Sequence, residues 1–208
     1  KAAEIPLHLA DNAGTFYARM DLSGHQDPII DGNLVFFPFS GVAAFDLATG
    51  EMKWSHEFRT AHKTYKKAYA PIIVEGDMVY ATGGGVVYAI NKTNGEIKWQ
   101  TERVKSGLIA QLIVADDMVL ARLGGNFFNQ GGKAFVLDKP LGVTAYNKAD
   151  GTNLWQYKGA SGGITNLVYL PELHAVFFAD ASKLIGIDSQ STGQVKEAFT
   201  LPVKSPAW

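Results

Sequence analysis

The fold is decided by the stretch Val42-Ala43-Ala44-Phe45-Asp46-Leu47-Ala48-Thr49-Gly50-Glu51-Met52-Lys53-Trp54, which the chain repeats with variations. Similar stretches occupy residues 86–99 and 143–155, so that Trp99 follows Trp54 after 45 residues and Trp155 follows after another 56. A weaker fourth copy at residues 184–193 is followed by Glu197 at the place of the tryptophan. A period near 45, built from short apolar runs and glycine turns, is typical of a radially repeated β-structure.

The second copy shows most clearly how one repeat is built. Short apolar runs alternate with the turns Glu75-Gly76-Asp77, Gly83-Gly84-Gly85 and Asn94-Gly95, and we expect Gly95 to adopt a positive φ. The last run alternates polar and apolar residues, which predicts a half-exposed outer strand. The expected strands are residues 70–74, 78–82, 86–90 and 96–101, which together make one antiparallel propeller blade.

The rest of the chain shows the same alternation of short apolar runs and turns. No apolar pattern of helical period is long enough to predict a helix. The sequence therefore predicts an all-β protein, a β-propeller of four-stranded antiparallel blades. We interpret residues 1–208 as a single propeller region. Four blades are expected at about residues 25–58, 68–103, 108–158 and 162–200, with partial blades at residues 1–24 and 201–208.

Composition excludes several classes of function. The 208 residues carry a formal net charge of -1, which provides no field to attract nucleic acid or an anionic membrane. No apolar run approaches the length needed for a transmembrane segment. The absence of cysteine excludes disulfides and thiolate metal sites. It fits a protein exported to the periplasm or the extracellular space, and a cytosolic protein is the alternative. The chain opens on Lys1 rather than Met, which suggests a processed or truncated terminus.

The repeated Asp or Asn, turn glycine and outer-strand tryptophan resemble the tryptophan-docking repeat of the PQQ-type (quinoprotein alcohol dehydrogenase-like) β-propellers. The likeness spans roughly residues 25–200 and is closest at residues 44–54. It implies that Trp54, Trp99 and Trp155 are structural docking residues, each packed between neighbouring blades with its indole N–H bonded to the next blade. A buried tryptophan needs such a partner on physical grounds as well. Glu197 then implies a weaker junction in the fourth copy.

The resemblance also bears on the extent of the protein, because propellers of this family usually close with seven or eight blades. The chain contains four recognisable blades and ends that fall inside blades. We expect either a fragment of a larger ring or a half completed by a second copy or fragment, since an open row of blades would expose apolar sheet surface. A small closed ring is the alternative.

Two unusual loops are the candidate site for a ligand or protein partner. One is the basic, aromatic loop at residues 59–69, and the other is an insertion at residues 124–140 that accounts for the longer third spacing. Alternating strand directions place both loops on one face of the propeller, where binding residues commonly lie. The simpler interpretation is a solvated lysine run and a decorated hairpin. The candidate residues are His62, Lys63, Tyr65, Lys66 and Lys67 in the first loop, and Asn126, Phe127, Phe128 and Asn129 in the second.

No catalytic or metal-binding residues are predicted. The aspartates fall mainly at turns, where their side chains bond to nearby backbone, and the five histidines are scattered. Two hypotheses remain open. The first is a non-catalytic scaffold or partner-binding propeller of the cell envelope, with no cofactor. The second is part of a PQQ-dependent oxidoreductase whose PQQ and Ca²⁺ ligands lie largely outside this chain, although the adjacent cysteines common in that family are absent.

Overall fold

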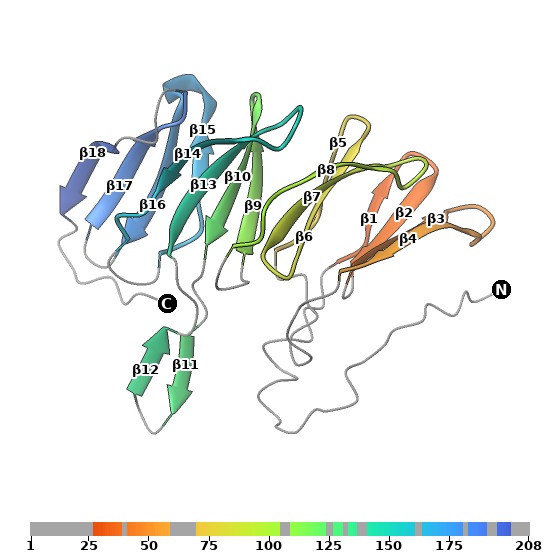
Figure 1. Ribbon diagram of the computed structural model, residues 1–208, viewed down its shortest axis with the longest axis horizontal. Helices are drawn as coiled ribbons and strands as arrows, with labels where there is room; N and C mark the ends of the chain where they lie inside the picture. Colours follow the sequence, from red (N-terminus) through yellow and green to blue (C-terminus); the bar gives the residue numbers. More distant parts are fainter. Residues whose placement is uncertain are drawn as a thin grey trace. The chain divides into compact units, whose positions relative to one another are not determined.

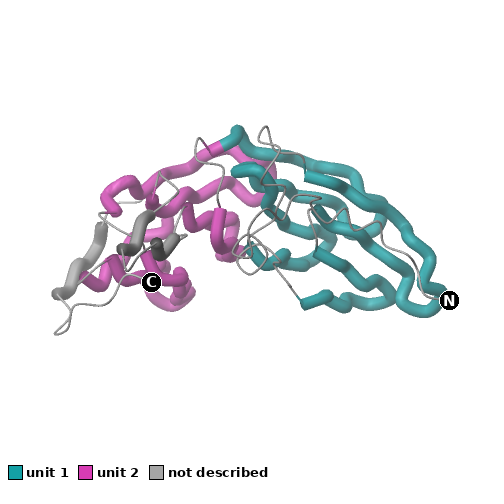
Figure 2. The backbone as a smooth tube through the Cα atoms, turned by 90° about the horizontal axis from the view of Figure 1, so that it is seen from below, with its two compact units in different colours: residues 1–103 teal, residues 104–208 magenta. Residues whose placement is uncertain are grey.

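The computed structural model describes a chain of β-strands in two compact units, residues 1–103 and 104–208 (Figure 2). Among the described residues the helical structure is a single 3-10 turn, Pro171–Leu173. The described residues are 27–38, 41–58, 70–104, 109–123, 127–130, 133–136, 141–160, 164–180, 183–190 and 195–200, with the backbone alone for 127–130, 133–136 and 195–200.

The first unit contains two four-stranded antiparallel sheets, in each of which the strands pair in chain order (Figure 1). The first sheet consists of β1 (Ile29–Asp31), β2 (Leu34–Pro38), β3 (Gly41–Asp46) and β4 (Met52–Glu57). The second consists of β5 (Ile73–Glu75), β6 (Met78–Gly83), β7 (Val86–Asn91) and β8 (Ile97–Gln100).

The second unit contains two further four-stranded antiparallel sheets and a separate hairpin. One sheet has the order β14-β13-β10-β9, since the hairpin β11–β12 interrupts it in sequence. Its strands are β9 (Ile109–Ala115), β10 (Met118–Leu123), β13 (Gly142–Asn147) and β14 (Asn153–Tyr157), and the hairpin is β11 (Phe127–Gln130) with β12 (Lys133–Val136). The other sheet consists of β15 (Val168–Leu170), β16 (Ala175–Asp180), β17 (Lys183–Asp188) and β18 (Val195–Thr200).

These four sheets confirm the prediction of an all-β protein of four-stranded antiparallel blades. The predicted strand positions are close to those observed, and β5 begins at Ile73 where residue 70 was expected. The segments predicted to be partial blades, residues 1–24 and 201–208, lie outside the described residues.

Strand burial follows the position of each strand within its sheet. The third strands β3 and β13 are almost entirely buried, which explains their continuous runs of small and apolar residues. The outer strand β4 instead exposes residues on either side of one buried side chain, Trp54. The sequence shows this difference as a change from an apolar run to an alternating pattern.

A β-bulge recurs at the same place in all four sheets, between the third and the outer strand. The register shifts lie between Ala44 and Phe45, and at the corresponding steps of β7, β13 and β17. A bulge of this kind redirects the side chains that follow it. The register places Trp54 opposite Ala44, Trp99 opposite Ala89, Trp155 opposite Ala145 and Glu197 opposite Gly186.

Each unit has a core that lies between its two sheets. In the first unit Phe36, Val42 and Trp54 of one sheet pack with Val79 and Ile90 of the other. The core of the second unit is built in the same way, from Leu120, Val143, Ala145, Trp155, Val176, Phe178, Ile185 and Ile187. A sheet that leaves an apolar face uncovered needs its neighbour, as in other repeat proteins.

The tight turn at Gly95 gives a test of this packing. Gly95 has a φ of 75° as the sequence predicts, and a Cβ there would lie 2.6 Å from Trp54 Cγ. We expect Gly95→Ala to lower the free energy of unfolding by about 3 kcal/mol, through backbone strain and overpacking together. Gly76→Ala is the matched control, because Gly76 has a φ of 57° and open space around it. Its expected cost is about 1 kcal/mol, from strain alone. Urea denaturation measures both, and equal losses would contradict the packing argument.

Candidate functional site

The basic loop that the sequence singles out lies outside the described residues. This concerns His62, Lys63, Tyr65, Lys66 and Lys67, all within residues 59–69. Asn126 also lies outside them. Their assignment to a ligand or partner site therefore stays a prediction.

The insertion in the third sheet is described as a hairpin in its backbone. Phe127 and Phe128 lie on β11 opposite Val136 and Phe135 of β12, and Asn129 follows them on the same strand. The sheet continues across the insertion, since Leu123 of β10 still pairs with Gly142 of β13. The insertion is thus an addition to a complete sheet, which leaves its residues available for a role other than folding.

Trp54 links the two sheets of the first unit. Its indole Nε1 donates a hydrogen bond to the backbone oxygen of Lys92 at 2.9 Å. The ammonium group of the same Lys92 lies 2.6 Å from Asp31 Oδ2, so that one residue of the turn between β7 and β8 contacts both edge strands of the first sheet. His56 Nε2 lies 2.5 Å from the oxygen of Gly95 and packs beside the indole. Trp54 and His56 of β4 are thus each bonded to a backbone oxygen of the turn between β7 and β8.

Trp155 makes the corresponding contact in the second unit. Its indole Nε1 lies 2.9 Å from the backbone oxygen of Ser189, and Ser189 is fully buried. Ser189 in turn donates from its backbone N–H and its hydroxyl to the oxygen of His174, at 2.9 and 2.8 Å. Trp99 is also buried, with its ring centroid 6.0 Å from that of Tyr80. A buried indole that has such an acceptor loses little on leaving water.

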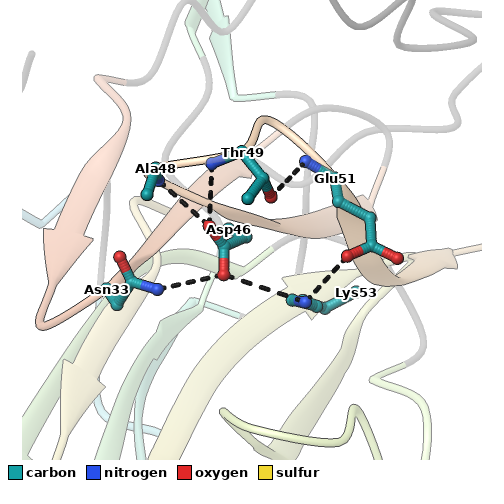
Figure 3. A network of polar contacts seen from close by, with 6 residues as sticks. All are labelled: Asn33, Asp46, Ala48, Thr49, Glu51 and Lys53. Atoms are coloured by element: carbon teal, nitrogen blue, oxygen red, sulfur yellow. Dashed lines mark hydrogen bonds and ion pairs between the residues drawn. The ribbon is translucent and has the colours of Figure 1, made fainter.

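The aspartate of the repeated turn serves the turn itself (Figure 3). Asp46 Oδ1 accepts from the backbone N–H groups of Ala48 and Thr49 at 3.0 and 2.9 Å. Its other oxygen accepts from Asn33 at 3.0 Å and lies 3.8 Å from the ammonium of Lys53. The hydrogen bond from the Thr49 backbone is the main cause that lowers the pKa of Asp46, and Lys53 adds to it. Asn91, Asn147, Asp150 and Asp188 make similar bonds to their own turns.

Two turn aspartates depart from this expectation, because they contact the neighbouring sheet. One is Asp31, which pairs with Lys92. The other is Asp116, whose carboxylate accepts a hydrogen bond from the hydroxyl of Tyr169 and lies 3.7 Å from His174 Nδ1. Gln190 Nε2 lies 3.0 Å from the same imidazole nitrogen. The structure thus gathers an acid, an imidazole, a phenol and an amide between the last two sheets.

Sequence reasoning missed this group, although the repeat contains a signal for it. The turn between the first two strands places Gly32 and Gly76 at positive φ in the first unit. Asp116 stands at the position of these glycines in the next sheet of the chain, with a φ of 49°. His174, with a φ of 46°, ends the longer turn of the last sheet, directly after the 3-10 turn Pro171–Leu173. They are the non-glycine residues at positive φ among those described. A positive φ is uncommon outside glycine, although Asp and His adopt it more often than most residues do.

Acidic and imidazole groups are otherwise dispersed. Within the described ranges no three His, Asp or Glu side chains gather in a way that could hold a metal ion. The same part of the chain contains no helix with the length and apolar character to cross a membrane.

Comparison with known proteins identifies the repeat. A family model described as outer membrane protein assembly factor BamB matches residues 39–202. Among solved structures, BamB from Moraxella catarrhalis superposes with a TM-score of 0.64 at 18% identity, over 88% of this chain and 52% of that one. The chain therefore spans about half the length of that protein. No curated protein sequence matches the chain.

Enzymes share the same fold. A europium-containing methanol dehydrogenase gives a TM-score of 0.63 at 12% identity, over 87% of this chain and 42% of that one. A quinohemoprotein alcohol dehydrogenase from Pseudomonas putida HK5 gives 0.57 at 15% identity, over 87% and 35%. At these identities the likeness establishes the fold of PQQ-type repeat propellers, as the sequence predicts.

The indole contact in the second unit can be tested by substitution. Trp155→Phe keeps most of the apolar contact and removes the donor to Ser189, so we expect a loss of about 1–2 kcal/mol in unfolding free energy. Trp155→Ala removes the contact as well, with an expected loss of about 3–5 kcal/mol. Leu154→Ala on the same strand is the control, because Leu154 is half exposed and should change stability by less than about 0.5 kcal/mol. A Trp155→Phe variant as stable as wild type would overturn the role of the hydrogen bond.

The turn at Asp46 predicts a dependence of stability on pH. Its pKa is lowered from 3.8 on folding, so the stability it contributes is present above that value and is lost as pH falls through the folded value. We expect the melting temperature of the wild type to fall more steeply below pH 3.8 than that of Asp46→Asn, which cannot titrate. Thermal scans across this range measure the difference, and parallel curves would contradict it.

Proposed function

Because this chain belongs to the family of the outer membrane protein assembly factor BamB, we propose that it is a non-catalytic propeller scaffold that binds a protein partner in the cell envelope. The observation that carries the proposal is the match of the family model to residues 39–202, four-fifths of the chain. The name of the family describes its members as factors in the assembly of outer membrane proteins. Periplasmic location and partner binding are proposed for this chain on that basis.

The distribution of polar side chains supports a scaffold. Turn acids such as Asp46 and Asp150 are engaged by their own backbone, and Asp31 is engaged by Lys92. These groups stabilise the fold. The lowered pKa values of Asp46 and Asp150 come mainly from hydrogen bonds within their own turns. Strongly perturbed groups gathered in a cleft are typical of catalytic sites.

The proposed binding surface is the pair of loops that decorate the repeat. The β11–β12 hairpin extends a sheet that is already complete, and residues 59–69 carry three lysines, an arginine and two tyrosines. Tyrosine, phenylalanine and arginine are enriched at protein interfaces. We propose that Phe127, Phe128 and Asn129 of the hairpin contact a partner, and that the aromatic and basic residues of the loop do so as well.

Site-specific photo-crosslinking in cells tests this surface. A photoreactive aromatic residue is placed at Phe128, at Lys66 and, as control, at Thr93, which is exposed in the turn between β7 and β8. We expect covalent adducts with the same protein from the first two positions and none from Thr93. Adducts from Thr93 alone, or none from Phe128 and Lys66, would refute the assignment.

A second candidate function is part of a PQQ-dependent oxidoreductase, which the structural likeness to a methanol dehydrogenase favours. PQQ and Ca²⁺ are added to the intact protein, excess ligand is removed by gel filtration, and the absorbance of retained quinone is read. A scaffold should retain no quinone. Retention that depends on Ca²⁺ would favour the oxidoreductase and contradict the first proposal.

A further inference from the structure

We propose that Arg122 binds a carboxylate group that an acidic side chain of the protein partner supplies, which rests on the proposed function and names the chemistry of the partner. Arg122 is the last residue but one of β10. The next residue, Leu123, pairs with Gly142, and the β11–β12 hairpin lies between these two in the chain. The hairpin of the proposed partner surface therefore leaves the sheet at the end where Arg122 lies.

The guanidinium group of Arg122 lacks a full set of partners. Its Nη1 donates a hydrogen bond to the backbone oxygen of Ile164 at 3.2 Å, whereas its Nε is buried and has no hydrogen-bond partner. No carboxylate within the described ranges forms an ion pair with it. A buried charge without a partner is costly, and the planar guanidinium fork matches a carboxylate with parallel hydrogen bonds. The residue is partly exposed, so a ligand can reach it.

The acid of the neighbouring sheet acts on another group. Asp180 pairs through its backbone with Ile164, and its charge is the second cause, after burial, that raises the pKa of Tyr157. Burial lowers the pKa of the Arg122 guanidinium, and no described acid opposes this shift. Arginine nonetheless stays protonated at neutral pH, because its ordinary pKa is so high. The positive charge of Arg122 is thus present and uncompensated.

The junction between the last two sheets has another side chain to hold it at this level. Gln111 lies opposite Arg122 on β9. Its amide accepts from the backbone N–H of Leu167 at 2.7 Å and donates to the backbone oxygen of the same residue at 3.3 Å. The strand reaches this level because β9 has seven residues, whereas the inner strands β1, β5 and β15 have three. Arg122 is therefore not needed to hold the sheets together.

The repeat also shows that folding does not require a charge at this position. In each sheet it is the fourth residue after the one that pairs with the Asp or Asn of the repeated turn, and the other three sheets place Pro38, Thr82 and Ala179 there. The first unit forms its tryptophan junction with Pro38 at this place. The charge is thus special to the sheet that bears the insertion. Arginine is also among the residue types that contribute most to protein–protein binding.

Titration of the isotope-labelled full-length chain with sodium acetate tests the carboxylate site without a partner. The chain has four arginines, so Arg122→Lys identifies the Nε–H resonance of Arg122 by its loss. We expect this resonance to shift saturably with acetate and not with sodium chloride at the same ionic strength. Arg103, which is exposed, is the control and should show no saturable shift. An Arg122 resonance that responds alike to the two salts would overturn the site.

Photo-crosslinking from Phe128 tests whether the partner supplies the carboxylate. We expect Arg122→Gln to lower the yield of the adduct at least about tenfold, and Arg122→Lys to lower it less, because lysine keeps the charge without the planar fork. Arg103→Gln is the matched control and should leave the yield unchanged. Arg122 variants that crosslink as the wild type does would overturn the inference. So would a loss of adduct that both variants show only together with a lower melting temperature, since the role of Arg122 would then be structural.

Failure of the partner surface and failure of this inference give different results. A wild type without a Phe128 adduct would refute the partner surface itself, and the acetate titration then decides the carboxylate site on its own. A saturable acetate shift with unchanged adducts in the Arg122 variants would identify a small organic acid as the ligand and refute the partner as its source.

Discussion

The structure depends above all on the indole N–H of an outer-strand tryptophan that reaches a backbone carbonyl of the next sheet. Trp54 does this at Lys92 and Trp155 at Ser189, both at 2.9 Å. The recurrent bulge before the tryptophan sets its direction, and in the first unit the glycine of the next turn leaves room for the ring. Each sheet alone would expose an apolar face, so this contact is what turns separate sheets into a packed core.

The polar residues of the turns also serve the fold. A turn that reverses the chain between the third and the outer strand leaves backbone N–H groups without partners, and Asp46 or Asn91 accepts from them. Acidic side chains used in this way are poorly suited to catalysis, because their hydrogen-bonding capacity is already engaged. Function must then come from what is added to the repeat or from positions where the repeat is altered.

The chain shows both kinds of departure. The β11–β12 hairpin is added to a complete sheet, and it belongs to the proposed partner surface. Asp116 takes the turn position that Gly32 and Gly76 occupy in the first unit, and its carboxylate contacts Tyr169 of the neighbouring sheet.

The sequence by itself determined the fold, because apolar runs, turn glycines and outer-strand tryptophans recur with one period and each has a local physical cause. It also placed Gly95 at positive φ and the insertion between β10 and β13. Only the tertiary structure brought Asp116, Tyr169, His174 and Gln190 together, since these residues lie up to 74 positions apart in the chain. Whether these side chains meet depends on how the two sheets pack against each other. No local sequence pattern encodes the distances between them in space. The sequence shows Asp116 at the place of a turn glycine, but it does not show which side chains Asp116 contacts.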